Sequence, residues 1–135
     1  MELLRTTDQL SRRLVPLLKA EELSPTQYNV LRILRGAEPH GLLCRGIGER
    51  MISRDPDMTR LLDRMEKRNL ITRERQKDDR RVIMTRITSE GLAFLKKLDQ
   101  PVRELHKRQF AHMKAGRMKA LSELLEEVVK REPGS

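Results

Sequence analysis

Apolar side chains recur at intervals of three, four and seven residues near both ends of the chain, a spacing that lines one face of an α-helix. In the N-terminal part these positions are Leu3, Leu10, Leu14 and Leu17. A stretch starting at about Glu90 carries Leu92, Leu95, Leu98, Val102 and Leu105, and a last one carries Leu121, Leu124, Leu125 and Val128. We predict three helices here, with Pro16 bending or interrupting the first and Pro101 kinking the second.

Two further helices are predicted before the middle of the chain. In LSPTQYNVLRIL, Ser24 is placed to be the N-cap, Pro25 the first helical residue and Gln27 the partner in a capping box. The next stretch, GLLCRGIGERMI, has only a weak helical pattern. Its Gly46 and Gly48 are expected where a second helix approaches closely.

That second helix is predicted in SRDPDMTRLLDRMEKRNL, with Asp55 as its cap and Pro56 in its first turn. One face is apolar and consists of Met58, Leu61, Leu62 and Met65. The opposite face is polar and charged and consists of Thr59, Arg60, Asp63, Arg64 and Lys67. The pattern indicates a helix that is buried on one side only.

After this helix the apolar period changes to that of a β-strand. Residues 70–75 (LITRER) and 82–88 (VIMTRIT) alternate, and the polar loop QKDDRR joins them. A hairpin this small needs the preceding helices to pack against. The predicted fold is therefore mostly α with a small β-hairpin wing, the order of elements found in a winged helix-turn-helix.

Composition and charge narrow the class of protein. The chain has 135 residues, of which 2% are aromatic, as expected for one helical domain. Its net charge of +9 favours a polyanionic partner. Nucleic acid is the first choice for this partner and an anionic membrane surface the second. The excess of positive charge is largest in residues 41–88, with 13 basic and 8 acidic side chains. No long apolar segment or signal-peptide pattern occurs, so we expect a cytoplasmic protein that does not enter membranes.

The charged helix and the hairpin loop together predict a surface that binds double-stranded DNA. Arginine on an exposed helix face donates to guanine edges in the major groove, and a basic loop beside it follows the backbone or enters the minor groove. The residues expected to contact DNA are Arg54, Thr59, Arg60, Arg64, Lys77, Arg80 and Arg81. Asp79 is expected to orient a neighbouring arginine of the wing, because a carboxylate facing phosphate would be repelled.

Three segments, LSPTQYNVLRIL, MTRLLDRMEKRNLITR and DDRRVIMTRITSEG, resemble the MarR family of transcriptional regulators. The last contains Asp79, Arg81, Ile87 and Thr88 at the family's D-x-R-x5-L-T spacing, with Ile in place of Leu. Asn69 stands where relatives often have Gly, and it also tolerates a left-handed backbone. The resemblance implies a symmetric dimer on a pseudo-palindromic duplex, usually a repressor released by a small ligand or a modification.

The terminal apolar stripes also predict self-association, because two long helices beside a small DNA-binding region leave more apolar surface than a monomer covers. The expected dimer contacts are Leu3, Leu10, Leu14, Leu17, Leu121, Leu124, Leu125 and Val128. Within a single domain of residues 1–135, this assigns residues 1–22 and 90–131 to dimerisation helices. Residues 24–88 are assigned to the DNA-binding region.

The remaining reactive side chains do not indicate a catalytic site. Cys44 is expected as a small apolar residue in or near the core. The alternative role for it is that of a redox-sensing thiol. The three histidines lack metal-ligand spacing, no cofactor site stands out, and a metal shared at a dimer interface stays an alternative. Two other functions remain open: a nonspecific architectural DNA-binding protein, and an adapter that uses the winged lobe to bind an acidic protein.

Overall fold

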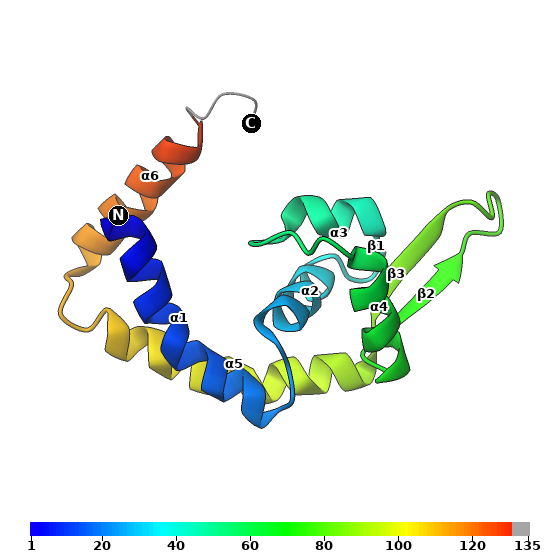
Figure 1. The fold of residues 1–135 in the computed structure, drawn as a ribbon, viewed down its shortest axis with the longest axis horizontal. Helices are drawn as coiled ribbons and strands as arrows, with labels where there is room; N and C mark the ends of the chain where they lie inside the picture. Colours follow the sequence, from blue (N-terminus) through cyan, green and yellow to red (C-terminus); the bar gives the residue numbers. More distant parts are fainter. Residues whose placement is uncertain (131–135) are drawn as a thin grey trace. The chain divides into compact units, whose positions relative to one another are not determined.

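The computed structural model describes residues 1–130 (Figure 1). Its elements, in chain order, are α1 (Glu2–Ala20), α2 (Pro25–Gly36), β1 (Leu42–Leu43), α3 (Cys44–Arg50), α4 (Met58–Lys67), β2 (Ile71–Arg75), β3 (Ile83–Ile87), α5 (Ser89–Gln109) and α6 (Ala115–Lys130). The mostly helical fold with a small antiparallel sheet is as predicted. The chain divides into two compact units, Met1–Val102 and the residues from Arg103 onward, and α5 extends across the boundary.

Side-chain capping bonds mark where α2 and α4 begin. The capping box of α2 is confirmed, since Ser24 Oγ accepts from the N–H of Gln27 and the N–H of Ser24 donates to Gln27 Oε1, both at 3.1 Å. The prediction that Asp55 caps α4 is wrong. Asp57 is the cap, because its Oδ1 accepts from the N–H of Arg60 at 3.0 Å, while Asp55 Oδ1 accepts from the N–H of Asp57 at 2.7 Å. Pro56 therefore precedes the helix.

The predicted hairpin is present as β2 and β3, and a third strand that the pattern did not predict completes the sheet. The strand order is β1-β3-β2, with both pairs antiparallel. Leu42 lies opposite Thr85, and Ile71 lies opposite Ile87. A two-residue strand is too short to show an alternating pattern, so only its pairing with β3 reveals it.

The core of the first unit is aliphatic and draws on every helix from α1 to α5. Its fully buried side chains include Leu18, Val30, Leu31, Leu34, Ile47, Leu62, Met65, Leu70, Ile71 and Leu95. α1 contributes Leu18, with Leu14 and Leu17 partly buried against the same core. The helix continues past Pro16, so of the two predicted outcomes, a bend or an interruption, the interruption does not occur. A proline in a helix removes one backbone donor, and Leu17 and Leu18 directly after it still pack against the core.

The close helix contact expected at Gly46 and Gly48 is absent from the described chain. The atoms nearest to a Cβ added at Gly46 belong to Arg50 and Leu42, and at Gly48 to Arg54, none of them in α4. The tight approach occurs at Gly91 in the first turn of α5. A Cβ there would lie 2.5 Å from the carbonyl oxygen of Leu70, so glycine allows α5 to start directly against the sheet.

Cys44, expected as a small apolar residue in or near the core, is exposed in the structure. It is the first residue of α3 and follows β1, an edge strand of the sheet, so it lies at the margin of the core. Ile47, one turn later, is the buried residue of this helix. No helix in residues 1–130 is long and apolar enough to cross a membrane.

Candidate nucleic-acid interface

The centre of the candidate interface is α4, which is apolar on one side and cationic on the other. Leu61, Leu62 and Met65 are buried, as the sequence pattern predicted. Thr59, Arg60, Arg64 and Lys67 are exposed along the same helix. The buried face fixes the helix against the core, and the exposed face leaves hydroxyl and guanidinium donors available to a polyanion.

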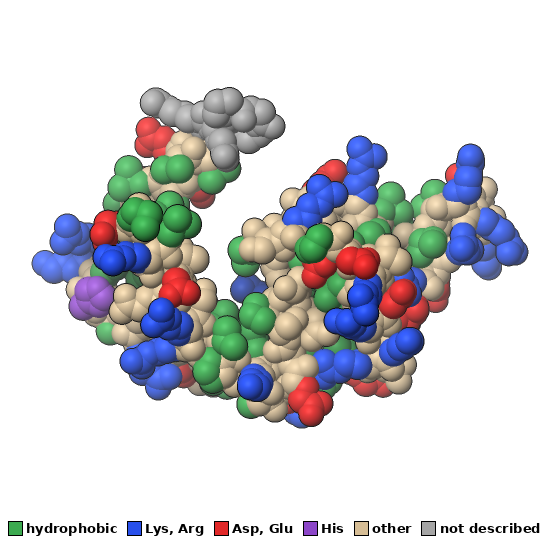
Figure 2. Space-filling view, viewed as in Figure 1, with side chains coloured by type: hydrophobic (Ala, Val, Ile, Leu, Met, Phe, Trp, Pro, Cys, Tyr) green, Lys and Arg blue, Asp and Glu red, His purple; other side chains and the backbone are tan. Residues whose placement is uncertain are grey.

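The hairpin beside α4 carries the second group of exposed cations. Lys77, Arg80 and Arg81 are exposed in the loop between β2 and β3, and Figure 2 shows Lys and Arg side chains gathered at this tip. Asp79 Oδ1 accepts from the backbone N–H of Arg81 at 3.0 Å and from its Nε at 3.2 Å. Arg75 Nη1 also donates to the carbonyl oxygen of Arg80 at 2.7 Å. These bonds shape the loop and leave its basic side chains in solvent.

A cluster that the sequence analysis missed joins the hairpin to α4. Arg73, on β2, lies between Asp63 and Glu66 of α4 and forms ion pairs with both. Its Nη2 is 2.9 Å from Glu66 Oε1, and its backbone N–H donates to Glu66 Oε2 at 3.2 Å. Strand alternation contained the signal, because Arg73 shares a strand face with the buried Ile71.

These bonds, led by the one to Glu66, raise the pKa of the Arg73 guanidinium above its ordinary value, although partial burial opposes the shift. The side chain therefore stays charged at every pH at which a protein–DNA complex is studied.

The carboxyl end of α4 is attached to the rest of the first unit by polar contacts. Asn69 adopts the predicted left-handed conformation, with φ of 59°. Arg68 Nη1 donates to the carbonyl oxygen of Glu22 at 2.6 Å, and its guanidinium lies 5.7 Å from the ring centre of Phe94. Thr88 Oγ1 donates to the carbonyl oxygen of Asn69 at 2.6 Å. α4 and the hairpin are thus held as one body.

Arg54 lies in residues 51–57, the segment that leads from α3 into α4, and it is exposed. This segment is connected to α2 by a hydrogen bond from the N–H of Ile52 to Asn29 Oδ1 at 2.7 Å. Ile52 itself is 88% exposed, so its side chain adds little apolar contact to hold the segment. The hydrogen bond to the Asn29 side chain therefore connects α2 directly to the approach to α4, and Met51 of the same segment packs against the core.

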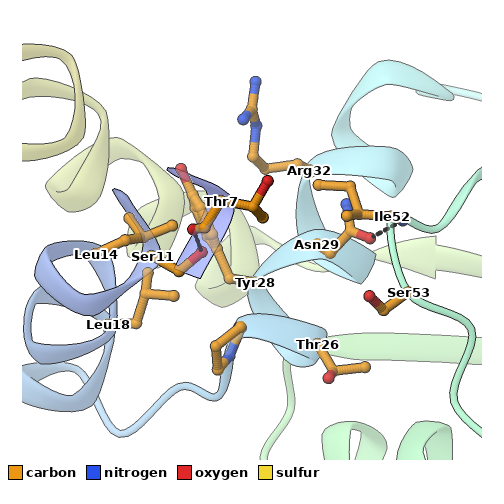
Figure 3. Close-up of a pocket in the computed structure, with 11 residues that line it drawn as sticks. Thr7, Ser11, Leu14, Leu18, Thr26, Tyr28, Asn29, Arg32, Ile52 and Ser53 are labelled. Carbon is orange, nitrogen blue, oxygen red and sulfur yellow. Dashed lines mark hydrogen bonds between the residues drawn. The ribbon is translucent and has the colours of Figure 1, made fainter. Parts of the chain in front are cut away.

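A pocket of about 340 Å³ lies between α1, α2 and this same segment (Figure 3). Its lining combines apolar, hydroxyl and amide groups with one guanidinium, and consists of Thr7, Ser11, Leu14, Leu18, Pro25, Thr26, Tyr28, Asn29, Arg32, Ile52 and Ser53. The Arg32 guanidinium lies 5.8 Å from the ring centre of Tyr28. The sequence analysis did not find this pocket, because its residues come from three separate segments.

The side chains predicted to mediate dimerisation fall into two groups. Leu14 and Leu17 are partly buried against the core of their own chain, whereas Leu3 is 54% exposed. In α6, Leu124, Leu125 and Val128 are exposed and Leu121 is half-buried. Among residues 1–130 no cluster of three or more His, Cys, Asp or Glu side chains is suited to hold a metal ion.

A cationic helix that is buried on one side and flanked by a charged hairpin defines a winged helix-turn-helix protein. Residues 23–83 match the model of the MarR family. The crystal structure of the MarR transcription factor from Planctomyces limnophilus matches with a TM-score of 0.70 and 40% sequence identity. The match covers 92% of this chain and 90% of that one. The chain belongs to the MarR family of transcriptional regulators.

Two other relatives extend this similarity. The homoprotocatechuate degradative operon repressor of Escherichia coli is 29% identical over 114 residues, which are 84% of this chain and 76% of the repressor. The PcaV transcriptional regulator from Streptomyces coelicolor, solved in complex with its natural ligand, is 27% identical with a TM-score of 0.75, over 93% of this chain and 90% of that one. These relatives are transcription regulators and not enzymes.

Proposed function

We propose that this regulator is a homodimeric repressor that binds a pseudo-palindromic operator in double-stranded DNA. The observation that carries the proposal is that exposed donors on α4 and on the hairpin loop belong to one body, because Arg73 of β2 is paired with Asp63 and Glu66 of α4. In that arrangement α4 enters the major groove and reads bases through Thr59, Arg60 and Arg64. Arg54, Lys77, Arg80 and Arg81 contact the backbone or the minor groove, and Asp79 orients Arg81.

Dimerisation in this proposal uses residues 1–22 and 90–131, of which residue 131 lies outside the described part of the chain, and residues 24–88 contact DNA. Its support is the exposed apolar stripe of α6, together with Leu3 of α1. An exposed stripe of this kind is typical of a surface that another copy covers. A two-fold dimer then presents two copies of α4 to successive major grooves, about 34–36 Å apart.

The effector in this proposal is a small aromatic carboxylate that binds the pocket lined by Tyr28 and Arg32. Leu14 and Pro25 offer apolar surface for a ring, hydroxyls such as Ser11 offer hydrogen bonds, and Arg32 offers a charge partner for a carboxylate. The Escherichia coli relative regulates an operon that degrades homoprotocatechuate, itself an aromatic carboxylic acid.

Relief of repression follows from the position of this pocket. Asn29 lines the pocket and also accepts the hydrogen bond of Ile52, in the segment that leads to Arg54 and α4. A ligand that binds better to one arrangement of this segment shifts the population toward it, and a ligand with equal affinity for both shifts nothing. DNA affinity therefore depends on pocket occupancy.

Selection of bound genomic fragments by the purified protein tests the DNA-binding proposal. A specific repressor should prefer its selected duplex to scrambled DNA by at least about a thousandfold at moderate salt. A preference below about tenfold would identify a nonspecific architectural protein instead. If no retarded species appeared in a gel-shift assay, the remaining function would be that of an adapter that binds protein.

Effector release is tested separately on the selected duplex. Homoprotocatechuate should release the protein, whereas 4-methylcatechol, which has the same ring without the carboxylate, should act at least about tenfold more weakly. Arg32→Met should remove most of that difference. Equal effects of the two compounds on the wild-type protein would rule out the carboxylate as the recognised group.

A further inference from the structure

The proposed recognition helix carries acidic side chains among its basic ones. Asp63 is three residues after Arg60 and four residues before Lys67, positions that meet on one face of a helix. A carboxylate at that spacing forms ion pairs with its basic neighbours, and each such pair occupies a donor that would otherwise contact DNA. Glu66 adds a second negative charge to the same helix.

In the structure both carboxylates are turned toward β2. Asp63 and Glu66 form their ion pairs with Arg73, and within residues 1–130 neither is paired with Arg60, Arg64 or Lys67. The Arg73 side chain is 22% exposed, against 49% for Asp63 and 41% for Glu66. A guanidinium enclosed at this position presents a fork of donors to two acceptors at once.

Arg73 is held to α4 through its backbone as well as its side chain. It lies in the middle of β2, opposite Thr85, which is buried. Its own N–H donates to Glu66 Oε2 at 3.2 Å while Nη2 contacts Oε1 at 2.9 Å, so one residue holds both oxygens of Glu66. The bonds to these carboxylates also raise the Arg73 pKa, which keeps the guanidinium charged.

We propose that Arg73 is a positioning residue for DNA binding, which holds Asp63 and Glu66 against the hairpin and so keeps Arg60 available to the duplex. The inference rests on the proposed DNA-binding function and assigns it a residue that does not itself touch DNA. It differs from a purely structural role, in which Arg73 would serve only to hold the hairpin on α4.

The test compares variants on a duplex that the wild-type protein selects from a randomised pool. Arg73→Met removes the guanidinium and frees Asp63 to pair with Arg60, with the charge of Glu66 unpaired on the same helix, so Kd should rise about tenfold. The triple variant Arg73→Met, Asp63→Asn, Glu66→Gln also lacks the guanidinium, but its amides cannot pair with Arg60 as ions. Its Kd should return to within about threefold of the wild-type value.

A charge-matched control separates local relief from a general gain in positive charge. The variant Arg73→Met, Glu38→Gln, Glu104→Gln has the same net charge as the triple variant, but it neutralises exposed carboxylates outside α4. Its Kd should stay about as high as that of Arg73→Met alone. Thermal melting of each variant shows whether its fold is retained.

The outcomes are distinct. If the triple variant binds as weakly as Arg73→Met although both are folded, Arg73 acts by holding the hairpin and the proposal is overturned. Equal recovery in the charge-matched control would also overturn it. If Arg73→Met is unfolded, the double variant Asp63→Asn, Glu66→Gln decides: our proposal expects unchanged or tighter binding, and a holding role expects weaker binding. Absence of any selected duplex for the wild-type protein contradicts the DNA-binding function itself.

Discussion

Helices α4 and α6 are both amphipathic by sequence, yet the apolar face of α4 is buried and that of α6 is exposed. The ten residues of α4 include three buried side chains, and polar contacts from Arg68 and Arg73 secure the helix on two sides. Of the sixteen residues of α6 none is buried, and Leu124, Val128 and Val129 are each at least 60% exposed. The same periodic pattern therefore marks a core-facing helix in one unit and an exposed apolar stripe in the other.

The largest effect is expected from removing a buried side chain of α4. Leu62 is 1% exposed, and Leu62→Ala should lower the free energy of unfolding by about 2–5 kcal/mol, because it removes buried methyl groups and leaves a cavity. Urea denaturation followed by circular dichroism measures the change. Leu124→Ala, at 60% exposure, serves as the control in a dilute sample and should cost far less.

Charges placed in the stripe of α6 should act on assembly and leave the fold of each chain intact. For Leu124→Glu with Val128→Glu we expect a monomer at micromolar concentration in sedimentation analysis. Its Kd for the selected duplex should rise about a hundredfold, since two linked DNA-binding regions bind more tightly than one. Ala115→Glu with Ser122→Glu introduces the same charge outside the stripe and should remain dimeric. A dimer in both variants would show that α6 is not the interface.

On the exposed face of α4, loss of a base contact should weaken DNA binding without affecting stability. Arg60→Ala should cost about 1–3 kcal/mol of binding free energy on the selected duplex if its guanidinium is bidentate to guanine. Fluorescence anisotropy with selected and scrambled duplexes measures the loss. Equal losses of binding free energy on the two duplexes would show that Arg60 contacts phosphate and does not read a base.

The smallest effect expected concerns the start of α4. Asp57→Ala should lower the free energy of unfolding by about 1 kcal/mol, because it removes the acceptor for the N–H of Arg60. Asp57→Asn keeps an acceptor and should be nearly neutral. Denaturant midpoints compare the two variants, and equal midpoints would mean that the first turn of α4 does not depend on this cap.

Local patterns in the sequence determine the helices, the hairpin and the charged face of α4. The capping box at Ser24, the left-handed Asn69 and the buried row of Leu61, Leu62 and Met65 each depend on residues within one turn of one another. Short-range sterics and hydrogen bonds decide such features, so the order of side chains is sufficient to predict them. The family resemblance likewise rests on contiguous segments, and it is confirmed.

Contacts between distant segments decide the rest. The strand β1 forms because it pairs with β3. Arg73 pairs with Asp63 and Glu66 only because β2 lies beside α4. The pocket forms only where α1, α2 and residues 52–53 come together. Cys44 is exposed at the start of α3, directly after the edge strand β1. A periodic pattern shows that a side chain is on a particular face of its element. Only the packed chain decides whether a core, an ion-pair partner or solvent lies against that face, because burial and pairing depend on residues far away in the sequence.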